Sequence, residues 1–214
     1  MAAGSLVLSD DSIVSRIDRS LLRVEYAMIL VGGLTVFGLM LLAVFSVGGR
    51  NFLNAPLPGY VDWIEQLMPV IAVFGVSYVR REGGHIRMDI VVGALKGRAL
   101  WLAELATTLA ILLVAMLLLW GSWEHFLRSF DISQPMWSRD SSMDIGLPIW
   151  PAKLVVPVAL GVLVVRLCLQ LWAYSLAFKH NQARPVAVPL LADVATQAAM
   201  EAKQVSSREQ EEAN

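Results

Sequence analysis

The chain has few of the residues on which catalysis, metal binding or cofactor binding depends. Among its 214 residues there is one cysteine, Cys168, and there are three histidines. A single cysteine excludes an internal disulfide framework. The sequence also has no Cys/His cluster, no glycine-rich phosphate loop and no nucleophile motif. We therefore predict that the protein is not an enzyme and that it holds no metal ion or cofactor.

The three histidines lie outside the long apolar runs of the sequence. They are His85, His125 and His180. A haem group inside a membrane needs axial histidines that face each other between spanning helices. Their positions therefore argue against a membrane anchor that binds haem.

Charged residues are scarce as well. They make up 16% of the chain, whereas soluble domains carry about 25%. The net charge is −1, which argues against nucleic acid as a partner. Hydrophobic residues make up 57% of the chain, and they are grouped in long runs instead of at amphipathic spacing. Such runs are typical of helices that a lipid bilayer surrounds.

Four apolar runs are long enough to cross a bilayer. They cover residues 26–49, 60–79, 102–123 and 147–172. At 1.5 Å per residue, each helix can span a hydrocarbon core of about 30 Å. The second run contains Asp62 and Glu65 near its start, and the fourth contains Lys153 and Arg166. We therefore predict an all-α integral membrane protein with a four-helix transmembrane domain over residues 26–178.

Basic residues near the ends of the runs predict the orientation of the chain. Eleven lie before the first run, between the second and third, or from the end of the fourth onwards, and four lie in the other two connections. The eleven are Arg16, Arg19, Arg23, Arg80, Arg81, Arg87, Lys96, Arg98, Arg166, Lys179 and Arg184, and the four are Arg50, Arg128, Arg139 and Lys153. This excess predicts that both termini and the middle connection lie in the cytoplasm.

The two terminal segments differ in character. Residues 1–25 include an amphipathic stretch with apolar residues on one side and three arginines on the other, and Ser12 can cap it. This pattern predicts a short interfacial helix that lies under the membrane. Residues 179–214 are polar and end in an acidic run, which predicts a flexible cytoplasmic tail.

Two acidic residues lie near the start of the second run. Asp62 and Glu65 are three residues apart, on one face of a helix. Pro69 removes an amide that would bond to the Glu65 carbonyl, which predicts a bend there. Acids inside spans often form proton or ion sites, but neither of these reaches the midplane. We therefore favour a structural pair with Arg50 or Lys153, and a proton or ion site is the alternative.

Arg166 is a basic residue inside an apolar run. It lies six residues from the end of the fourth run, about 9 Å inside it. An unpaired arginine at the bilayer centre costs about 2.5–3.5 kcal/mol, but at this depth its stem can reach outward to the interface. Snorkelling is the preferred explanation, and Glu25 and Glu104 are alternative partners.

The connection after the second run carries an ordered motif. Two glycines break the helix after Arg80-Arg81. Apolar residues then recur at helical spacing after Asp89, a possible helix cap. A generic basic loop explains the arginines but not this order.

Several motifs occur together in a characteristic order. They are Trp63-Ile64-Glu65, Phe74-Gly75, His85-Ile86-Arg87-Met88-Asp89, and Gly146-Leu147-Pro148-Ile149-Trp150-Pro151 with Pro157. In this order the chain resembles the small membrane subunit (DctQ-type) of tripartite ATP-independent periplasmic (TRAP) transporters. The likeness covers about residues 24–174 and includes the four-span topology. Many members have two adjacent acids where this chain has Ile64-Glu65.

The resemblance implies a non-catalytic subunit of the bacterial inner membrane. Its implied partners are a much larger permease subunit, a soluble periplasmic binding protein and the bilayer. The large subunit would hold the substrate and sodium sites, and the small one would steady the fixed scaffold during uptake of an organic acid such as a dicarboxylate. The candidate structural or interaction residues are Arg50, Asp62, Glu65, His85, Asp89, Lys153 and Arg166.

Two other functions remain as alternatives. A self-sufficient four-helix transporter that works as a dimer predicts an acid near the midplane of a span. A membrane anchor of a redox complex predicts histidines inside the spans. The apolar runs contain neither feature, so we prefer the scaffold subunit.

Overall fold

The computed structural model describes residues 13–55, 57–82 and 98–180 of the chain. These residues are mainly helical, and their β-pairing consists of two isolated bridges within residues 130–148. The predicted all-α class is therefore confirmed for the described part of the chain. His85 and Asp89, with the motif around them, lie outside the described residues, as does the predicted tail beyond residue 180.

The first helix, α1, runs without a break over Ile13–Phe52. Its 40 residues extend about 60 Å, roughly twice the thickness of the hydrocarbon core. The predicted run 26–49 forms only its second part. The prediction of a separate interfacial helix within residues 1–25 is wrong, because no glycine or proline separates that segment from the apolar run and the helix continues.

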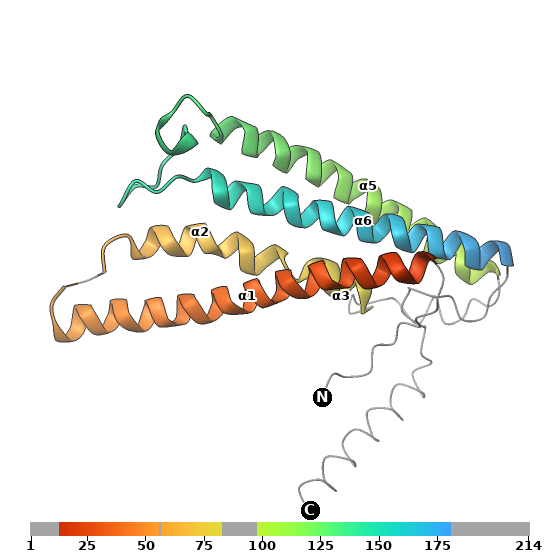
Figure 1. Cartoon of the computed structure of the whole chain (residues 1–214), viewed down its shortest axis with the longest axis horizontal. Coiled ribbons are helices and arrows are strands. Elements are labelled where there is room, and N and C mark those ends of the chain that lie inside the picture. The colour runs from red at the N-terminus through yellow and green to blue at the C-terminus, as the bar shows by residue number, and fades with distance from the viewer. Residues whose placement is uncertain (1–12, 56, 83–97, 181–214) are drawn as a thin grey trace, which may run out of the picture.

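The second helical segment of the bundle consists of two helices in line, α2 (Tyr60–Val73) and α3 (Val76–Arg81) (Figure 1). The helical hydrogen-bond pattern is interrupted at Phe74 and Gly75, although both keep helical backbone angles. Pro69 lies inside α2, so the interruption comes later in the chain than the predicted bend. Glycine is a weak helix former, which makes Gly75 a natural point for this break.

Two long antiparallel helices, α5 (Arg98–Ser129) and α6 (Trp150–His180), complete the bundle (Figure 1). Within the described part of the chain, three helices, α1, α5 and α6, are long and apolar enough to cross a membrane. The second helical segment is interrupted between α2 and α3. Helix α2 alone has 14 residues, which is a length of about 21 Å. Together α2 and α3 cover residues 60–81, which corresponds to about 33 Å of helix.

The helices run roughly along one axis, so the bundle has two ends (Figure 1). We call the end at which α1 begins and α6 finishes the terminal end. At the other end, residues 130–149 connect α5 to α6, and we call it the loop end. Figure 1 shows that α2 begins at the loop end and that α3 leads towards the terminal end.

Apolar packing is concentrated between α5 and α6. One buried cluster joins Leu112 and Ala115 of α5 to Leu163 and Leu167 of α6. A second cluster near the terminal end includes Trp101 of α5, Tyr174 of α6 and Val14 of α1. In α1 the most apolar stretch has none of its residues buried inside the chain. This surface suits contact with lipid or with another membrane subunit.

The connection at the loop end is a folded segment. It contains the short helix η1 (Pro135–Trp137), and the indole Nε1 of Trp150 donates a hydrogen bond to the Met136 carbonyl at 3.0 Å. Gly59, before α2, has a φ of 71°. A Cβ there would overlap the side chain of Ile145, so glycine permits both the left-handed turn and the close approach of this segment.

Candidate functional site

A network of polar side chains is buried inside the bundle on the terminal side. Four helices contribute to it, and its members are at most 5% exposed. They are Asp18 and Glu25 of α1, Ser77, Arg80 and Arg81 of α3, Thr108 of α5, and Arg166 and Gln170 of α6. We call this set the charge network.

Arg166 is the centre of the charge network. Its guanidinium makes two hydrogen bonds to the Glu25 carboxylate, from Nε to Oε1 at 2.8 Å and from Nη2 to Oε2 at 2.6 Å. Its third nitrogen, Nη1, donates to Oδ1 of Asp18. Arg166 and Glu25 are both fully buried. A bidentate pair of this kind fixes both the distance and the relative rotation of α1 and α6.

Two residues of α3 complete the pairing of these acids. Ser77 donates its hydroxyl to Oε1 of Glu25 at 2.5 Å. Arg81 donates to Asp18 from Nη2 at 2.9 Å and from Nε at 3.3 Å. The same guanidinium contacts Glu82 at 2.6 Å. Asp18 therefore joins Arg81 of α3 to Arg166 of α6.

Arg80 extends the charge network to α5. Its Nε donates to Oε1 of Gln170 at 3.1 Å, and its Nη2 donates to the Thr108 hydroxyl at 3.2 Å. Gln170 donates back to the Arg80 carbonyl at 3.5 Å. Both α3 arginines therefore point into the bundle and hold neighbouring helices.

The charges in the core of the charge network balance. Two carboxylates, on Asp18 and Glu25, meet two guanidiniums, on Arg81 and Arg166. Among the described residues, no buried side-chain nitrogen or oxygen lacks a hydrogen-bond partner. Burying an ion costs several kcal/mol unless such partners compensate, so the four charges require one another. Because an arginine guanidinium keeps its proton in proteins, the arrangement is suited to fixing helices and not to relaying protons.

The structure decides between the explanations for Arg166. The preferred one, snorkelling to the interface, is wrong, because the side chain is fully buried. The alternative partner Glu25 is correct, and Asp18 is a second partner. Glu104 is buried on α5. The physical reason is that two acids on α1 neutralise the Arg166 guanidinium inside the bundle, so the side chain does not need to reach the interface.

Sequence reasoning missed most of the charge network. Arg80 and Arg81 were assigned to the basic loop that sets the orientation, whereas they are buried. A usable signal was present in the spacing. Asp18 and Glu25 are seven residues apart, and Arg166 and Gln170 are four apart, so each pair shares a helix face.

A second polar cluster lies at the loop end and is built on Asp62. Its Oδ2 accepts hydrogen bonds from the Ser142 hydroxyl at 2.6 Å and from the backbone amides of Ile145 at 2.8 Å and Asp144 at 3.2 Å. The Asp144 side chain in turn accepts from the Gly59 amide at 3.0 Å. Asp62 thus fastens the segment 142–145 to the start of α2.

Lys153 belongs to a different pairing at the loop end. Its Nζ lies 2.9 Å from Oδ2 of Asp140 and also contacts the Ser129 hydroxyl. Hydrogen bonds from Ser129 and Lys153 lower the pKa of Asp140. Near it, Ser133 and Arg139 bond to Asp131 and lower its pKa to about 2.

The predicted pairing of Asp62 and Glu65 with Arg50 or Lys153 is wrong within the chain. Lys153 pairs with Asp140, and Asp62 is satisfied by a hydroxyl and backbone amides. Glu65 is exposed. Neither Glu65 nor Arg50 forms an ion pair with any residue that the structure describes. The reason is that the folded connection between α5 and α6 supplies the partners itself. It provides an acid for Lys153 and a hydroxyl and backbone amides for Asp62.

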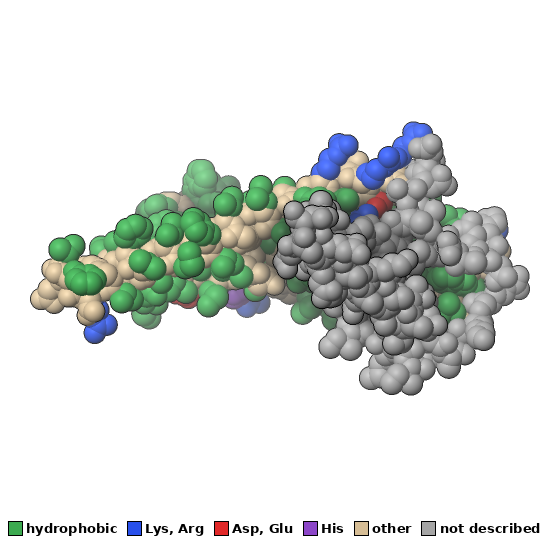
Figure 2. Space-filling model, turned by 90° about the horizontal axis from the view of Figure 1, so that it is seen from below, with side chains coloured by type: hydrophobic (Ala, Val, Ile, Leu, Met, Phe, Trp, Pro, Cys, Tyr) green, Lys and Arg blue, Asp and Glu red, His purple; other side chains and the backbone are tan. Residues whose placement is uncertain are grey.

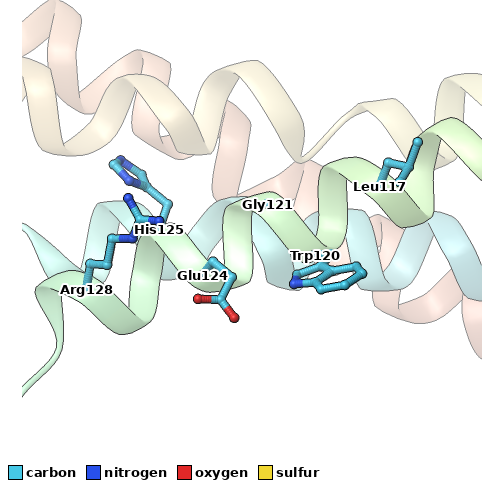
Figure 3. A pocket seen from close by; sticks show the side chains of 6 residues that line it. All are labelled: Leu117, Trp120, Gly121, Glu124, His125 and Arg128. Carbon is cyan, nitrogen blue, oxygen red and sulfur yellow. The ribbon is translucent and has the colours of Figure 1, made fainter.

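A surface hollow of about 540 Å³ lies along one face of α5 towards the loop end (Figure 3). Its lining residues follow one another at helical spacing and are Leu117, Trp120, Gly121, Glu124, His125 and Arg128. Figure 3 shows the His125 and Arg128 side chains lying close together, with Trp120 further along the helix. Among the described residues no cluster of three metal-ligating side chains occurs.

Comparison with protein families agrees with the fold and with the sequence motifs. A family model described as the DctQ component of tripartite ATP-independent periplasmic transporters matches residues 39–175, which is more than half of the chain. No curated protein matches the sequence. The matched region includes Arg80, Arg81 and Arg166 of the charge network, but the acids Asp18 and Glu25 precede it. The chain belongs to the DctQ family, the small membrane component of TRAP transporters.

Proposed function

We propose that this chain is the scaffold subunit of a bacterial inner-membrane TRAP transporter. It packs against a large permease subunit and works with a periplasmic binding protein. The complex uses an ion gradient, with sodium as the coupling ion, to take up an organic acid such as a dicarboxylate. The chain itself carries no step of the transport cycle.

The charge network is the observation that carries this proposal. The ions of the charge network are paired with partners on neighbouring helices, with contacts of 2.6–2.8 Å between Arg166 and Glu25. A solute or ion path needs polar groups that are free to bind and release a cargo. Side chains that are locked together provide rigidity instead, which is the property that a fixed scaffold needs.

The proposal includes four membrane crossings, with α2 and α3 forming the second. These two helices cover residues 60–81, and their combined length of about 33 Å matches the hydrocarbon core. Both termini and the middle connection then face the cytoplasm. Reporter fusions after Lys96 and Ala183 should report cytoplasm, and a fusion near Ser133 should report periplasm. A periplasmic signal at Lys96 would overturn this orientation.

A self-sufficient small transporter is the main rival, and Glu25 is the observation in its favour. This acid is buried within a long apolar helix, as the site of a proton-coupled carrier would be. Its two short bonds to Arg166 and the bond from Ser77 argue for a structural role. A carrier site would have to break all three bonds in each cycle.

Co-purification tests the scaffold proposal without knowledge of the substrate. A tagged copy of the chain is expressed with the large permease subunit of the same transporter, in the presence and in the absence of the binding protein. We expect the large subunit to co-purify with the tagged chain in stoichiometric amount. When this chain is not co-expressed, the yield of the large subunit itself should fall.

Reconstitution then separates the scaffold from its rival. The purified chain alone should show no sodium-driven uptake of radiolabelled succinate, whereas a self-sufficient carrier should produce uptake or proton exchange without other subunits. Robust sodium-driven uptake by the single chain would eliminate the scaffold role.

A further inference from the structure

Three arginines form an exposed row on the first turns of α1. Arg16, Arg19 and Arg23 are spaced by three and four residues, so they lie on one face of the helix. All three are exposed. Figure 2 shows cationic side chains projecting from one edge of the molecule on the side where α1 begins. We call these residues the arginine face.

The acids of the same segment point the other way. Asp18 and Glu25 alternate with the arginines in sequence, yet they are 2% and 0% exposed. Arg81 and Arg166 neutralise them inside the bundle. No described residue forms an ion pair with the arginine face. Among the described residues, the segment therefore presents three positive charges outward that no acid neutralises.

The arginine face lies at the depth of lipid headgroups. Apart from Ile17, which is 39% exposed among the arginines, the exposed large apolar side chains of α1 start at Val24 and Tyr26, which are 47% and 51% exposed. Along the helix axis, Arg23 is about 5 Å from Tyr26, Arg19 about 10 Å and Arg16 about 15 Å. The headgroup region is roughly 5–7 Å thick on each side. With the reach of an arginine side chain, or a modest tilt of the helix, all three guanidiniums meet this region.

We infer that the arginine face binds the phosphate groups of anionic phospholipids in the leaflet at the terminal end. A guanidinium matches a phosphate with two parallel hydrogen bonds, and three in a row can hold neighbouring headgroups. The charge network makes this possible by removing the acids that would otherwise neutralise the face. The inference rests on the membrane embedding of α1 and not on the identity of the partner subunits, so it stands or falls independently of the scaffold role.

The test measures lipid binding to the full-length chain in detergent. Native mass spectrometry counts bound phosphatidylglycerol and bound phosphatidylethanolamine for the wild type and for the variant R16Q/R19Q/R23Q. Each arginine near an anionic surface should contribute about fivefold in affinity. The preference for phosphatidylglycerol should therefore fall by roughly a hundredfold in the triple variant and by about fivefold in each single variant. The wild-type preference should also shrink at 1 M salt, because exposed charges are screened.

A matched control is the variant R50Q/R128Q. Arg50 and Arg128 are exposed as well, but they belong to different helices at the loop end. This variant should keep the preference for phosphatidylglycerol. Circular dichroism should show equal helix content in all variants, because the arginine face takes no part in the charge network.

Three outcomes would overturn the inference. The first is that the triple variant retains the full preference, and the second is that R50Q/R128Q loses as much of it as the triple variant does. The third outcome concerns the acidic residues Glu209, Glu211 and Glu212 near the C-terminus. A preference that arises only after residues 181–214 are removed would assign the arginine face to that segment instead of to lipid.

Discussion

The two ends of the bundle hold the same kinds of charged residue in different surroundings. At the loop end, Lys153 and Asp140 have side chains that are 20% and 48% exposed, and 13 residues separate them. On the terminal side, Arg166 and Glu25 are fully buried, and 141 residues separate them. The first pair belongs to a local connection, whereas the second joins the first helix to the last.

This difference sets how much each pair contributes to stability. An exposed pair contributes between zero and about 1 kcal/mol, because water screens the charges and solvates either partner alone. A buried pair leaves an uncompensated ion when one partner is removed. We therefore expect substitutions in the charge network to act on the whole bundle and substitutions at the loop end to act locally.

The largest effect is expected for Arg166→Met. The substitution leaves Glu25 without its bidentate partner and Asp18 with Arg81 alone. Removing one member of a buried ion pair costs about 3–5 kcal/mol. Thermal unfolding of the purified chain in detergent should show a large fall in the midpoint, together with a lower yield of folded protein.

Arg50→Met is the matched control for this prediction. Arg50 is exposed and has no ion-pair partner among the described residues, so the same chemical change should leave the unfolding midpoint nearly unchanged. Equal effects at the two positions would contradict the view that burial decides the energies.

Ser77→Ala should have a smaller effect. It removes the hydroxyl that donates to Glu25 at 2.5 Å but leaves both charges of the ion pair in place. Oε1 keeps its bond from Arg166, so the loss is that of one hydrogen bond to a charged acceptor, about 1.5–3 kcal/mol. The unfolding midpoint should fall less than for Arg166→Met. Ser175→Ala is the control, because that exposed hydroxyl bonds only to its own helix.

At the loop end, Asp62→Ala should loosen one connection without unfolding the bundle. The substitution removes the acceptor for the Ser142 hydroxyl and for the amides of Asp144 and Ile145. Hydrogen exchange of these amides should become several-fold faster, while the amides of α6 keep their protection. The exposed acid Glu124 provides the control as Glu124→Ala. Faster exchange throughout α6 would mean that Asp62 supports the whole bundle.

The sequence predicted the helices better than it predicted their contacts. Long apolar runs marked α1, α5 and α6, because the bilayer imposes a minimum length of apolar helix. The continuity of α1 across residue 25 follows from the absence of a helix-breaking signal, since residues 13–31 contain no glycine or proline. The amphipathic pattern of its first turns is present, but it belongs to one face of a continuous helix and not to a separate one.

The charge network could not be predicted because its pairings are long-range. Arg166 has an acid on α1 as its partner, 141 residues away, and no spacing rule connects two helices of unknown rotation. The family model did not supply the pairing either, since it matches residues 39–175 and both Asp18 and Glu25 precede that region. At the loop end, the backbone amides that satisfy Asp62 carry no side-chain signal at all.

The pH response of the loop end should appear only in acid. The pKa of Asp131 is lowered from 3.8 to about 2 by bonds from Ser133 and Arg139, and the pKa of Asp140 is also lowered. A lowered pKa stabilises the fold above the ordinary value of 3.8, and this contribution is lost as the pH falls towards 2. Near-ultraviolet circular dichroism reports on the packing of aromatic side chains, which at the loop end include Trp137 and Trp150. Its signal should be constant from about pH 7 to 5 and decline below about pH 4. The double variant D131N/D140N should lose this part of the response, and an unchanged acid transition in it would contradict the assignment.

The smallest effect is expected for Glu65→Gln in the isolated chain. Glu65 is exposed and forms no ion pair with a described residue, whereas Asp62, one turn earlier, is buried and accepts a hydrogen bond from Ser142. Surface substitutions of this kind change stability by no more than about 0.5 kcal/mol. The unfolding midpoint of the purified chain should therefore match that of the wild type. A clear fall would mean that Glu65 has a partner inside the chain. In the complete transporter the same variant tests a different contact: a loss of assembly there, with the isolated chain unaffected, would place the partner of Glu65 on another subunit. If assembly and substrate binding both survived but coupling was lost, the carboxylate would have a functional role, and the structural interpretation of this acid would fail.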